Sequence, residues 1–407
     1  MDGRITIGGV ALVDLAKRFG TPLYVYDAPT LRANVRAYRE AFAAHAPSRV
    51  AYSAKACALV GVLRVFRALP VSAASVGELE AAARAGIAAS RCWLHGNAKS
   101  EAEIRAAIAL GVGTIVIDGE REHERIARHV LRRTQRVWLR VSPSVVADTH
   151  SHLRTSGDQK FGIPLTGGRG RALALEIAKT RGLRLTGLHA HIGSQISDLE
   201  TFRRLADELA TFARELRGEG IPISEVCVGG GVGVSESAAQ PDVDAYAAAV
   251  ATPIHRALPD ATVVVEPGRS IVARAAVALY RVEDRKTTAS GRTFLAVDGG
   301  MGDNIRPALY GARYDAALAD RRDGARERVT IAGAYCEAGD VLIDDVELDR
   351  AEVGDVIAVP CIGAYSLAMA SNYNHRPRPA VVLVDRGSAR LIRRRERAAD
   401  LLRLERV

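Results

Sequence analysis

The stretch Val50-Ala51-Tyr52-Ser53-Ala54-Lys55 is a short apolar run that ends in a lysine, just ahead of a helical pattern that starts at Ala58. Lysine is scarce in this chain, because only six of its 56 lysines and arginines are lysines. An arginine stays protonated, whereas a partly buried lysine can lose its proton and act as an amine nucleophile. A solvated lysine at a strand end would explain Lys55 taken alone, but the rest of the chain argues against it.

Length and composition describe a globular protein of two domains. The 407 residues exceed what one compact core usually holds, and the hydrophobic (48%) and charged (25%) fractions are ordinary. The net charge of +9 comes from arginines spread along helical stretches such as 121–133. This distribution favours anionic small-molecule substrates and predicts no nucleic-acid partner.

Cysteine spacing and apolar runs bear on the compartment. The five cysteines show neither metal-type spacing nor a paired framework, so we expect no metal site and a reducing environment. No apolar segment follows a basic N-terminus, and no apolar run approaches the length that spans a bilayer. We therefore expect a cytoplasmic protein with no membrane partner.

Outward from Lys55, apolar strand-like runs alternate with amphipathic helical stretches such as 76–85 and 199–217. The runs fall at 49–53, 70–73, 91–94, 114–117, 136–141, 184–190, 225–228 and 261–265. This pattern predicts an α/β fold, a TIM-like (β/α)8 barrel with parallel strands inside and helices outside. A doubly wound sheet is the alternative, because periodicity alone does not show closure.

After Arg269 the pattern changes to strand-like runs joined by turn-rich pieces such as Asp320 to Gly324. The runs fall at 271–282, 293–297, 328–332, 341–343, 355–360, 379–384 and 390–394. They predict a second, all-β domain of the sandwich or barrel-like kind, joined by N-terminal strands at 4–7 and 23–26. The predicted boundaries are 28–275 for the barrel and 1–27 with 276–407 for the β domain.

Polar residues follow most of the barrel strands, at the end where such barrels carry their chemistry. They are Lys55, Ser75, Glu78, His95, Asn97, Lys99, His189, His191, Ser194, the glycines 229–231 and 233, Glu266 and Arg269. Loops are polar by default, which explains any one of these residues but not so many at one end of one architecture. We interpret them as a pyridoxal phosphate site with Lys55 as its amine.

Several residue types suit that cofactor. A glycine run gives backbone N–H groups close access to a phosphate, although a glycine-rich turn alone is a weak signal. The run lacks the Lys-Ser/Thr ending of a nucleotide P-loop and comes late in the alternation, so a nucleotide site is disfavoured. Glu266 could keep the pyridine nitrogen protonated, which favours decarboxylation over racemisation.

Three clusters in the β domain add candidates for substrate binding and proton transfer: Asp298 to Pro307 with Tyr310, Cys336-Glu337, and Gly363 to Asn374. A cysteine beside a glutamate offers a proton donor next to a receptor for an ammonium group. Arg269 and Arg306 could each bind a carboxylate in bidentate fashion. A buried, inert thiol is the alternative explanation of Cys336.

Together these residues resemble the fold-type III pyridoxal-phosphate decarboxylases, and within them the diaminopimelate decarboxylase family. The resemblance runs from about residue 20 to residue 385 and covers motifs on both predicted domains. The barrel motifs are Tyr52-Ser53-Ala54-Lys55, Ser75-Val76-Gly77-Glu78, His95-Gly96-Asn97, Lys160-Phe161-Gly162, His189 to Gln195, the triple glycine and Glu266-Pro267-Gly268-Arg269. The departures at Cys57, Ala98 and Gln159 concern fine tuning more than reaction class.

The resemblance implies a fold of the alanine racemase type and a role for each candidate. It implies a Schiff base on Lys55, ring stacking by His191, pyridine pairing by Glu266 and proton donation by Cys336. It implies phosphate binding by Ser194, Gly230, Gly231, Glu266 to Arg269 with Gly268 among them, and Tyr365. It implies substrate binding by Arg269, Arg306, Tyr310, Glu337 and Tyr365. It also implies a homodimer in which the β-domain loops complete the partner's site.

The implied reaction is the decarboxylation of meso-2,6-diaminopimelate to L-lysine. A relative acting on ornithine, arginine, carboxynorspermidine or a siderophore precursor is the second possibility, disfavoured by the arginine pair and Glu337. A pyridoxal-phosphate carrier without turnover is the third, and it would need no proton donor at Cys336. Glu266 disfavours an amino-acid racemase.

Overall fold

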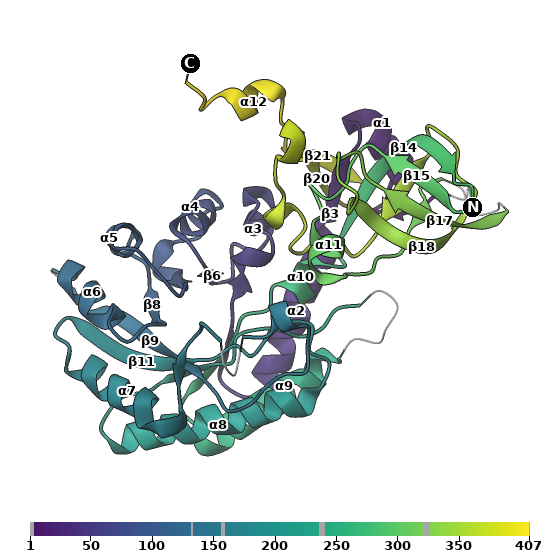
Figure 1. Cartoon of the computed structure of the whole chain (residues 1–407). Coiled ribbons are helices and arrows are strands. Elements are labelled where there is room, and N and C mark those ends of the chain that lie inside the picture. The colour runs from purple at the N-terminus through teal and green to yellow at the C-terminus, as the bar shows by residue number, and fades with distance from the viewer. Residues whose placement is uncertain (1–3, 132, 156–158, 236–240, 321–324, 407) are drawn as a thin grey trace. The chain divides into compact units, whose positions relative to one another are not determined.

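The computed structural model describes residues 4–131, 133–155, 159–235, 241–320 and 325–406 (Figure 1). The chain divides into two compact units. The barrel unit comprises Ala33–Val234 and Ala239–Ser270, and the sheet unit comprises Met1–Arg32, Ser235–Ala238 and Ile271–Val407. The predicted turn at Asp320 to Gly324 falls outside the described residues except for Asp320. Within the described ranges, no helix has both the length and the apolar character that crossing a membrane requires.

The barrel closes on the stretch that leads to Lys55. β4 (Ser48–Val50) pairs in parallel with β13 (Thr262–Val265), and β5 (Tyr52–Ser53) pairs in parallel with β6 (Val71–Ala73). Ala51 lies between β4 and β5, and its N–H donates to the Val265 carbonyl at 2.9 Å. One extended segment therefore joins the first and last strands of the sheet. The predicted (β/α)8 barrel is confirmed, and the doubly wound alternative is wrong, because such a sheet keeps two separate edges.

The other strands follow one another around the ring in chain order, and every pair is parallel. They are β7 (Cys92–Leu94), β8 (Thr114–Ile117), β9 (Gln135–Ser142), β11 (Leu183–His189) and β12 (Glu225–Cys227). The short β10 (Ile163–Pro164) pairs with β9 outside this order. The predicted strand runs agree with these bounds to within a few residues.

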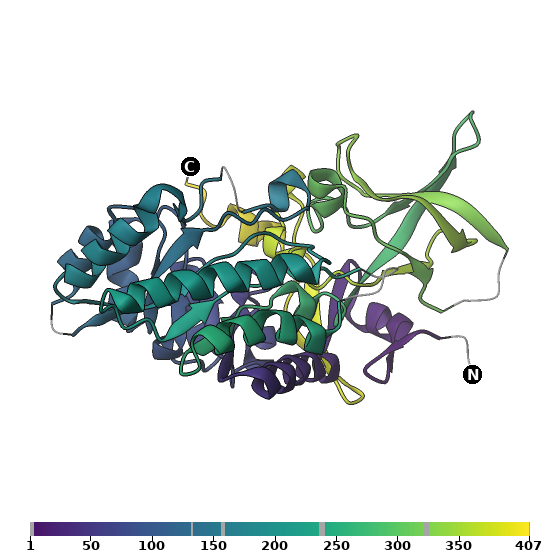
Figure 2. The ribbon, with the colours of Figure 1, turned by 90° about the horizontal axis from the view of Figure 1, so that it is seen from below.

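Helices surround the strands (Figure 1), and Figure 2 shows the two long helices α8 and α9 packed side by side. The helices are α2 (Ala28–His45), α3 (Val60–Val65), α4 (Val76–Arg84), α5 (Glu101–Leu110), α6 (Glu122–His129), α7 (Arg169–Lys179), α8 (Leu199–Gly218) and α9 (Val243–Ala257). Local sequence sets several of their ends. Ser100 and Glu103 form a capping box at the start of α5, and Asp198 caps α8.

The barrel interior is filled by side chains that point inward from the strands. Ala51, Trp93, Val116, Trp138, Cys227 and Val264 form one buried cluster. The two tryptophans of the chain face each other there, with ring centroids 5.0 Å apart. The barrel is therefore a packed core and not a pore, and reactive side chains can collect only at its ends.

The sheet unit contains a mixed sheet in which segments far apart in sequence are neighbours. The strand order is β18–β17–β15–β14–β3–β20–β21, with β16 and β19 attached at β14. These strands are β3 (Leu23–Asp27), β14 (Ala276–Thr287), β15 (Thr293–Val297), β16 (Ala317–Leu318), β17 (Arg326–Ala332), β18 (Val341–Asp349), β19 (Val356–Val359), β20 (Ala380–Asp385) and β21 (Ser388–Arg393).

The N-terminal segment joins this sheet, as predicted, because β3 lies between β14 and β20. β1 (Thr6–Ile7) and β2 (Val10–Ala11) form a separate hairpin, and α1 (Leu12–Phe19) packs its apolar face on the sheet. The prediction of one strand from 271 to 282 is wrong at its start. Residues Arg269–Val272 form the short helix α10, and β14 begins only at Ala276, which apolar composition alone does not reveal.

A buried carboxylate connects β3 and β14 to the loop that leads into α11 (Arg306–Tyr310). Asp303 Oδ2 accepts a hydrogen bond from the Tyr280 hydroxyl at 2.7 Å, and Tyr24 donates to the Asp303 carbonyl at 3.1 Å. The Gly300 N–H donates to Oδ1 at 2.8 Å. Burial raises the pKa of Asp303 to about 7, against the hydrogen bond from Tyr280. This carboxyl therefore changes its protonation state near neutral pH in the folded chain.

Asp303 should make the stability of the sheet unit depend on pH. Its pKa in the folded chain lies above the ordinary value, so its contribution to stability is full at low pH and is lost as pH rises through about 7. From about pH 5 to about pH 8, the free energy of unfolding of the unaltered protein should fall by about 2 kcal/mol relative to Asp303→Asn. Denaturant titrations at both pH values measure this difference. The exposed Asp315→Asn is the control, and a flat difference for Asp303→Asn contradicts the assignment.

Candidate functional site

Glu266 follows β13 directly, and its buried carboxylate collects three side-chain N–H groups. Trp93 donates from Nε1 to Oε1. His95 Nε2 lies 2.8 Å from Oε1, and His189 Nε2 lies 3.3 Å from Oε2. Trp93 belongs to β7, His95 follows that strand and His189 ends β11, so the barrel itself brings the donors to the carboxylate.

These donors keep Glu266 ionised. Burial raises the pKa of the Glu266 carboxyl, but the neighbouring His95 and His189 outweigh burial and hold that pKa well below its usual range. Burial also lowers the pKa of His189 to about 3, against the attraction of Glu266, so this imidazole is neutral. The contact through Nε2 places its one proton there. His189 Nδ1 has no hydrogen-bond partner among the described residues, as expected for the bare nitrogen of that tautomer.

The ligand-type atoms of His95, His189 and Glu266 all lie within 4.8 Å of one another, which is also the spacing of ligands around a metal ion. The Trp93 N–H on the same carboxylate favours a hydrogen-bonded anion instead. An indole N–H is only a donor, and beside a metal it would face a cation.

The glycine loop after β12 approaches the Glu266 turn through its bare backbone. A Cβ atom at Gly230 would collide with the Glu266 carbonyl, and one at Gly231 would collide with the Gly193 carbonyl. Gly231 also has a φ of +116°, which side chains rarely adopt. No described residue accepts a hydrogen bond from the backbone N–H of Gly230 or Gly231. Two neighbouring N–H groups without acceptors suit an anion.

Two further predicted phosphate ligands meet beside this loop. The Arg269 guanidinium is buried, and Nη2 donates to Ser194 Oγ at 3.1 Å. Gly268 lets the same turn approach the residues on both sides of Lys55, because a Cβ atom there would lie 3.1 Å from the Ser53 Cβ and 3.0 Å from the Ala56 Cβ. The turn at Glu266–Arg269 therefore packs directly against the Lys55 segment.

Lys55 lies in a single 3-10 turn, η1 (Ala54–Ala56), and is exposed at the end of β5. His191 lies across from the glycine loop, where a Cβ atom at Gly229 would come within 2.9 Å of its Nδ1. Burial lowers the pKa of His191 well below its ordinary value, and the charge of Lys55 lowers it further. The site thus combines a neutral imidazole with an exposed amine.

Comparison with known proteins identifies the family of this chain. Residues 29–273 match the family described as pyridoxal-dependent decarboxylase, pyridoxal binding domain. A diaminopimelate decarboxylase of Actinosynnema pretiosum is 41% identical over 99% of this chain and 93% of its own length. That of Bacillus subtilis is 38% identical over 99% of this chain and 95% of its own length. The chain belongs to the diaminopimelate decarboxylase family.

Solved structures of this family have the same fold. The diaminopimelate decarboxylase of M. jannaschii, crystallised with L-lysine, is 33% identical, with a TM-score of 0.94 over 100% of this chain and 96% of that one. The Helicobacter pylori enzyme is 32% identical, with a TM-score of 0.90 over 96% of this chain and 98% of that one. The predicted architecture, an α/β barrel of the alanine racemase type with a separate sheet, is confirmed.

Pyridoxal phosphate is the cofactor of this family, and the barrel residues fit it. The N–H groups of Gly230 and Gly231, Ser194 and Arg269 would hold the phosphate. The ionised Glu266 would face the pyridine nitrogen, and Lys55 would supply the amine. The assignment of these residues one by one remains a prediction.

The predicted residues of the sheet unit lie on loops and on α11. Cys336 is exposed, so the alternative that it is a buried, inert thiol is wrong for the single chain. Its backbone N–H donates to Asn374 Oδ1 at 2.9 Å. Glu337 is exposed and lies 3.5 Å from the Tyr373 hydroxyl. The half-buried Tyr365 has a φ of +60°, an unusual backbone conformation for a tyrosine.

Arg306 begins α11 and is buried, although it carries a charge. Its Nη1 donates to the Tyr314 hydroxyl at 2.8 Å, and its Nε has no hydrogen-bond partner among the described residues. Tyr310 ends the same helix, with its hydroxyl 4.0 Å from Met369 Sδ. A buried guanidinium with an open donor is a suitable receptor for a carboxylate.

Sequence reasoning missed Trp93 and the buried pair Asp118–Arg140. Arg140 Nε lies 3.7 Å from Asp118 Oδ1, and its guanidinium lies over the Phe161 ring at 4.4 Å. Asp118 Oδ1 also accepts the Gly162 N–H at 2.6 Å, so this pair places the Phe161-Gly162 loop. The scarcity of tryptophan could have drawn attention to Trp93, and Asp118 follows β8 as other site residues follow their strands.

Lys99 proves to be structural. Its ammonium is buried and donates to the carbonyls of Gly96 at 2.6 Å and Val116 at 2.7 Å, with Glu122 Oε1 at 2.8 Å. Two hydrogen bonds and one ion pair thus surround the ammonium group. Lys99 therefore joins the ends of β7 and β8 to α6.

The charge of Glu266 should be required for cofactor binding. Glu266→Gln places an amide NH2 among N–H donors and removes a charge-assisted hydrogen bond worth about 1.5–3 kcal/mol. The dissociation constant for pyridoxal phosphate, titrated by absorbance into the apoprotein, should rise about 10- to 100-fold.

Glu225→Gln is the matched control for this measurement. Glu225 is another buried carboxylate of the barrel, but it begins β12 and accepts a hydrogen bond from Trp138 Nε1 at 3.0 Å. Its position at the opposite end of the strand predicts a loss of stability with cofactor affinity unchanged. Equal losses of affinity in the two variants would contradict the role of Glu266.

Proposed function

We propose that this chain decarboxylates meso-2,6-diaminopimelate to L-lysine and carbon dioxide with pyridoxal phosphate as cofactor, the last step of lysine biosynthesis. The observation that carries the reaction class is the ionised Glu266 carboxylate inside the barrel. Bound pyridoxal phosphate with a protonated ring nitrogen accepts the electron pair that departing carbon dioxide leaves behind. The substrate follows from full-length relatives named diaminopimelate decarboxylase and from M. jannaschii, whose enzyme was crystallised with L-lysine.

The barrel residues hold the cofactor in this proposal. Lys55 is its covalent anchor, and Glu266 keeps the ring nitrogen protonated. The neutral His191 is the stacking residue. The phosphate ligands are Ser194, Gly230, Gly231, Gly268 and Arg269, with Tyr365 from the sheet unit. The pairing of Arg269 with Ser194 and the open N–H groups of the glycine loop support this assignment.

In this proposal, the sheet-unit residues bind the distal end of the substrate and donate a proton. The distal end of diaminopimelate carries both an ammonium and a carboxylate group. Arg306 offers a buried guanidinium with an open Nε donor for the carboxylate, and the exposed Glu337 offers a carboxylate for the ammonium. Arg269, Tyr310 and Tyr365 complete this set. Cys336 donates the proton that replaces carbon dioxide.

A homodimer completes the site in this proposal. The barrel domain spans 28–275, and the β domain spans 1–27 and 276–407. The β-domain loops around Cys336 and Glu337 serve the site of the partner subunit. Their exposure in the single chain supports this arrangement. We place the enzyme in the cytoplasm, where free cysteines persist.

A substrate panel tests the reaction. The protein with added pyridoxal phosphate is given meso-diaminopimelate, ornithine, arginine and lysine in parallel, and carbon dioxide and amine products are recorded. We expect L-lysine from meso-diaminopimelate alone, because simple diamine precursors lack the distal carboxylate. Lys55→Ala should lose at least about 10³-fold in turnover.

Other outcomes of the panel overturn the proposal. Carbon dioxide release from ornithine or arginine instead would indicate a related decarboxylase. No release from any compound, together with a normal cofactor spectrum, would indicate a carrier or a narrower substrate.

Mixed dimers test the shared site. We expect Lys55→Ala and Cys336→Ala chains to be nearly inactive on their own, because each lacks one essential group. After mixing, half of the dimers should be hybrids, and each hybrid should hold one intact site. About a quarter of the activity of the unaltered protein should therefore return. A mixture as inactive as its components would show that Lys55 and Cys336 act from the same chain.

A further inference from the structure

Two loops of the sheet unit contact each other at the predicted proton donor. The Cys336 loop (residues 335–337) is contacted by the Asn374 loop (residues 371–378), and the Tyr335 N–H also donates to Asp340 Oδ2 at 2.8 Å. Asn374 Oδ1 accepts the Cys336 N–H at 2.9 Å, and the Tyr373 hydroxyl lies 3.5 Å from Glu337 Oε2. The Tyr373 ring stacks on Tyr335 with centroids 6.1 Å apart, so the Asn374 loop touches every residue of the Cys336 loop.

The Asn374 loop has a backbone that needs external support. Asn374 has a φ of +52° and His375 a φ of +53°, two successive residues in the left-handed region without a glycine. Such conformations persist only where surrounding contacts hold them. The contacts with the Cys336 loop come from residues 373–376, so the two ends of the Asn374 loop need an anchor besides the hydrogen bond from the Ser371 N–H to the Gly302 carbonyl at 2.8 Å.

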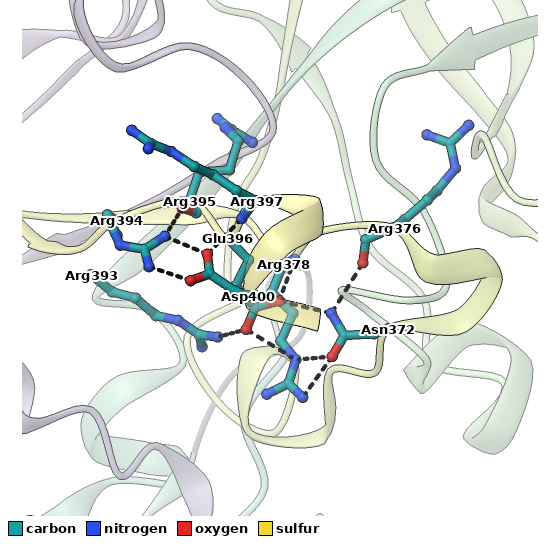
Figure 3. A network of polar contacts seen from close by, with 9 residues as sticks. All are labelled: Asn372, Arg376, Arg378, Arg393, Arg394, Arg395, Glu396, Arg397 and Asp400. Carbon is teal, nitrogen blue, oxygen red and sulfur yellow. Dashed lines mark hydrogen bonds and ion pairs between the residues drawn. The ribbon is translucent and has the colours of Figure 1, made fainter. Parts of the chain in front are cut away.

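Glu396 supplies that anchor (Figure 3). Its Oε2 accepts the Asn372 side-chain amide at 2.7 Å and the Arg378 backbone N–H at 2.9 Å. The Glu396 N–H donates to the Arg378 carbonyl at 3.2 Å, and the Arg378 guanidinium returns to Asn372 Oδ1 at 3.0 Å. One carboxylate thus bonds to residues at both ends of the Asn374 loop.

Asp400 is the other acidic residue of the arginine-rich segment (residues 393–400). Its hydrogen bonds go to that segment and not to the Asn374 loop. Asp400 pairs with Arg394 at 2.5 Å and accepts the Arg397 N–H at 2.8 Å, which starts α12 (Ala398–Leu402). The two carboxylates of the network in Figure 3 therefore have separate tasks. Glu396 bonds to the loop, and Asp400 bonds only to the arginine-rich segment.

We infer that Glu396 is a positioning residue that, through Asn372 and the Asn374 loop, fixes the Cys336 loop for proton delivery. The inference rests on the proposed role of Cys336 but concerns a residue about 60 positions away along the chain. Burial raises the pKa of Glu396, and the Arg378 N–H and the Asn372 amide lower it below its usual value. The carboxylate is thus ionised at neutral pH, as an acceptor of three donors from Asn372, Arg378 and Arg393 must be.

Hydrogen exchange tests whether Glu396 fixes the Cys336 loop, and it does so independently of catalytic activity. In Glu396→Ala, the oxygen that accepts from Asn372 and Arg378 is removed, so the anchor loosens. We expect the peptide covering 333–341 to exchange about tenfold faster, because the Cys336 N–H loses its fixed partner. The kcat for carbon dioxide release should fall about tenfold, as a displaced catalytic group requires. Asn372→Ala removes the same anchor from the other side and should reproduce both effects.

Asp400→Ala is the matched control, since it removes the neighbouring carboxylate without touching Asn372. Its exchange at 333–341 and its kcat should equal those of the unaltered protein. Unchanged exchange at 333–341 in Glu396→Ala overturns the inference, whatever the activity. So does a lower kcat without faster exchange. If the unaltered protein does not act on meso-diaminopimelate, the proposed function fails, while the exchange rates still decide whether Glu396 fixes the Cys336 loop.

Discussion

A buried negative charge must be compensated, and the barrel unit is arranged around one such charge. The Glu266 carboxylate is buried, and the N–H groups of Trp93, His95 and His189 stabilise its charge. Those donors come from β7, the residue after it and the end of β11, so their geometry depends on the register of strands that are far apart in sequence. A shift in that register would leave the charge uncompensated. Site and fold therefore stabilise each other.

Closure of the ring imposes the second constraint. The segment from Ser48 to Ser53 bonds to β13 on one side and β6 on the other, and it leads directly to Lys55 in η1. The lysine is consequently placed by the same backbone that completes the barrel. The turn at Glu266–Arg269 packs on that segment through Gly268. Lys55, Glu266 and the predicted phosphate ligand Arg269 thus lie in one part of the barrel unit, which is the arrangement a cofactor-binding site needs.

The sequence alone predicts the features of the structure that depend on local patterns of residues. Apolar alternation located the barrel strands, and motif residues at the strand ends located Lys55, His191 and Glu266. The helix α10 escaped detection because four apolar and polar residues before a strand carry no distinctive period. Trp93 and the pair Asp118–Arg140 escaped because burial of a polar group is decided by partners distant in sequence. The bonds from Glu396 to Asn372 and Arg378 cross from one loop to another and have no local signature at all.

The three acceptors around Lys99 have a consequence for how this chain can vary. They converge on a single nitrogen from Gly96, Val116 and Glu122. A guanidinium is wider and planar, and it spreads its donors over three nitrogens, so it cannot occupy a point where all acceptors meet. An arginine at position 99 could therefore not take the place of the ammonium without breaking part of this set of contacts. In a chain with few lysines, a lysine can thus be present for its geometry, as at Lys99, or for its reactivity, as predicted for Lys55. The surroundings of the nitrogen distinguish the two cases.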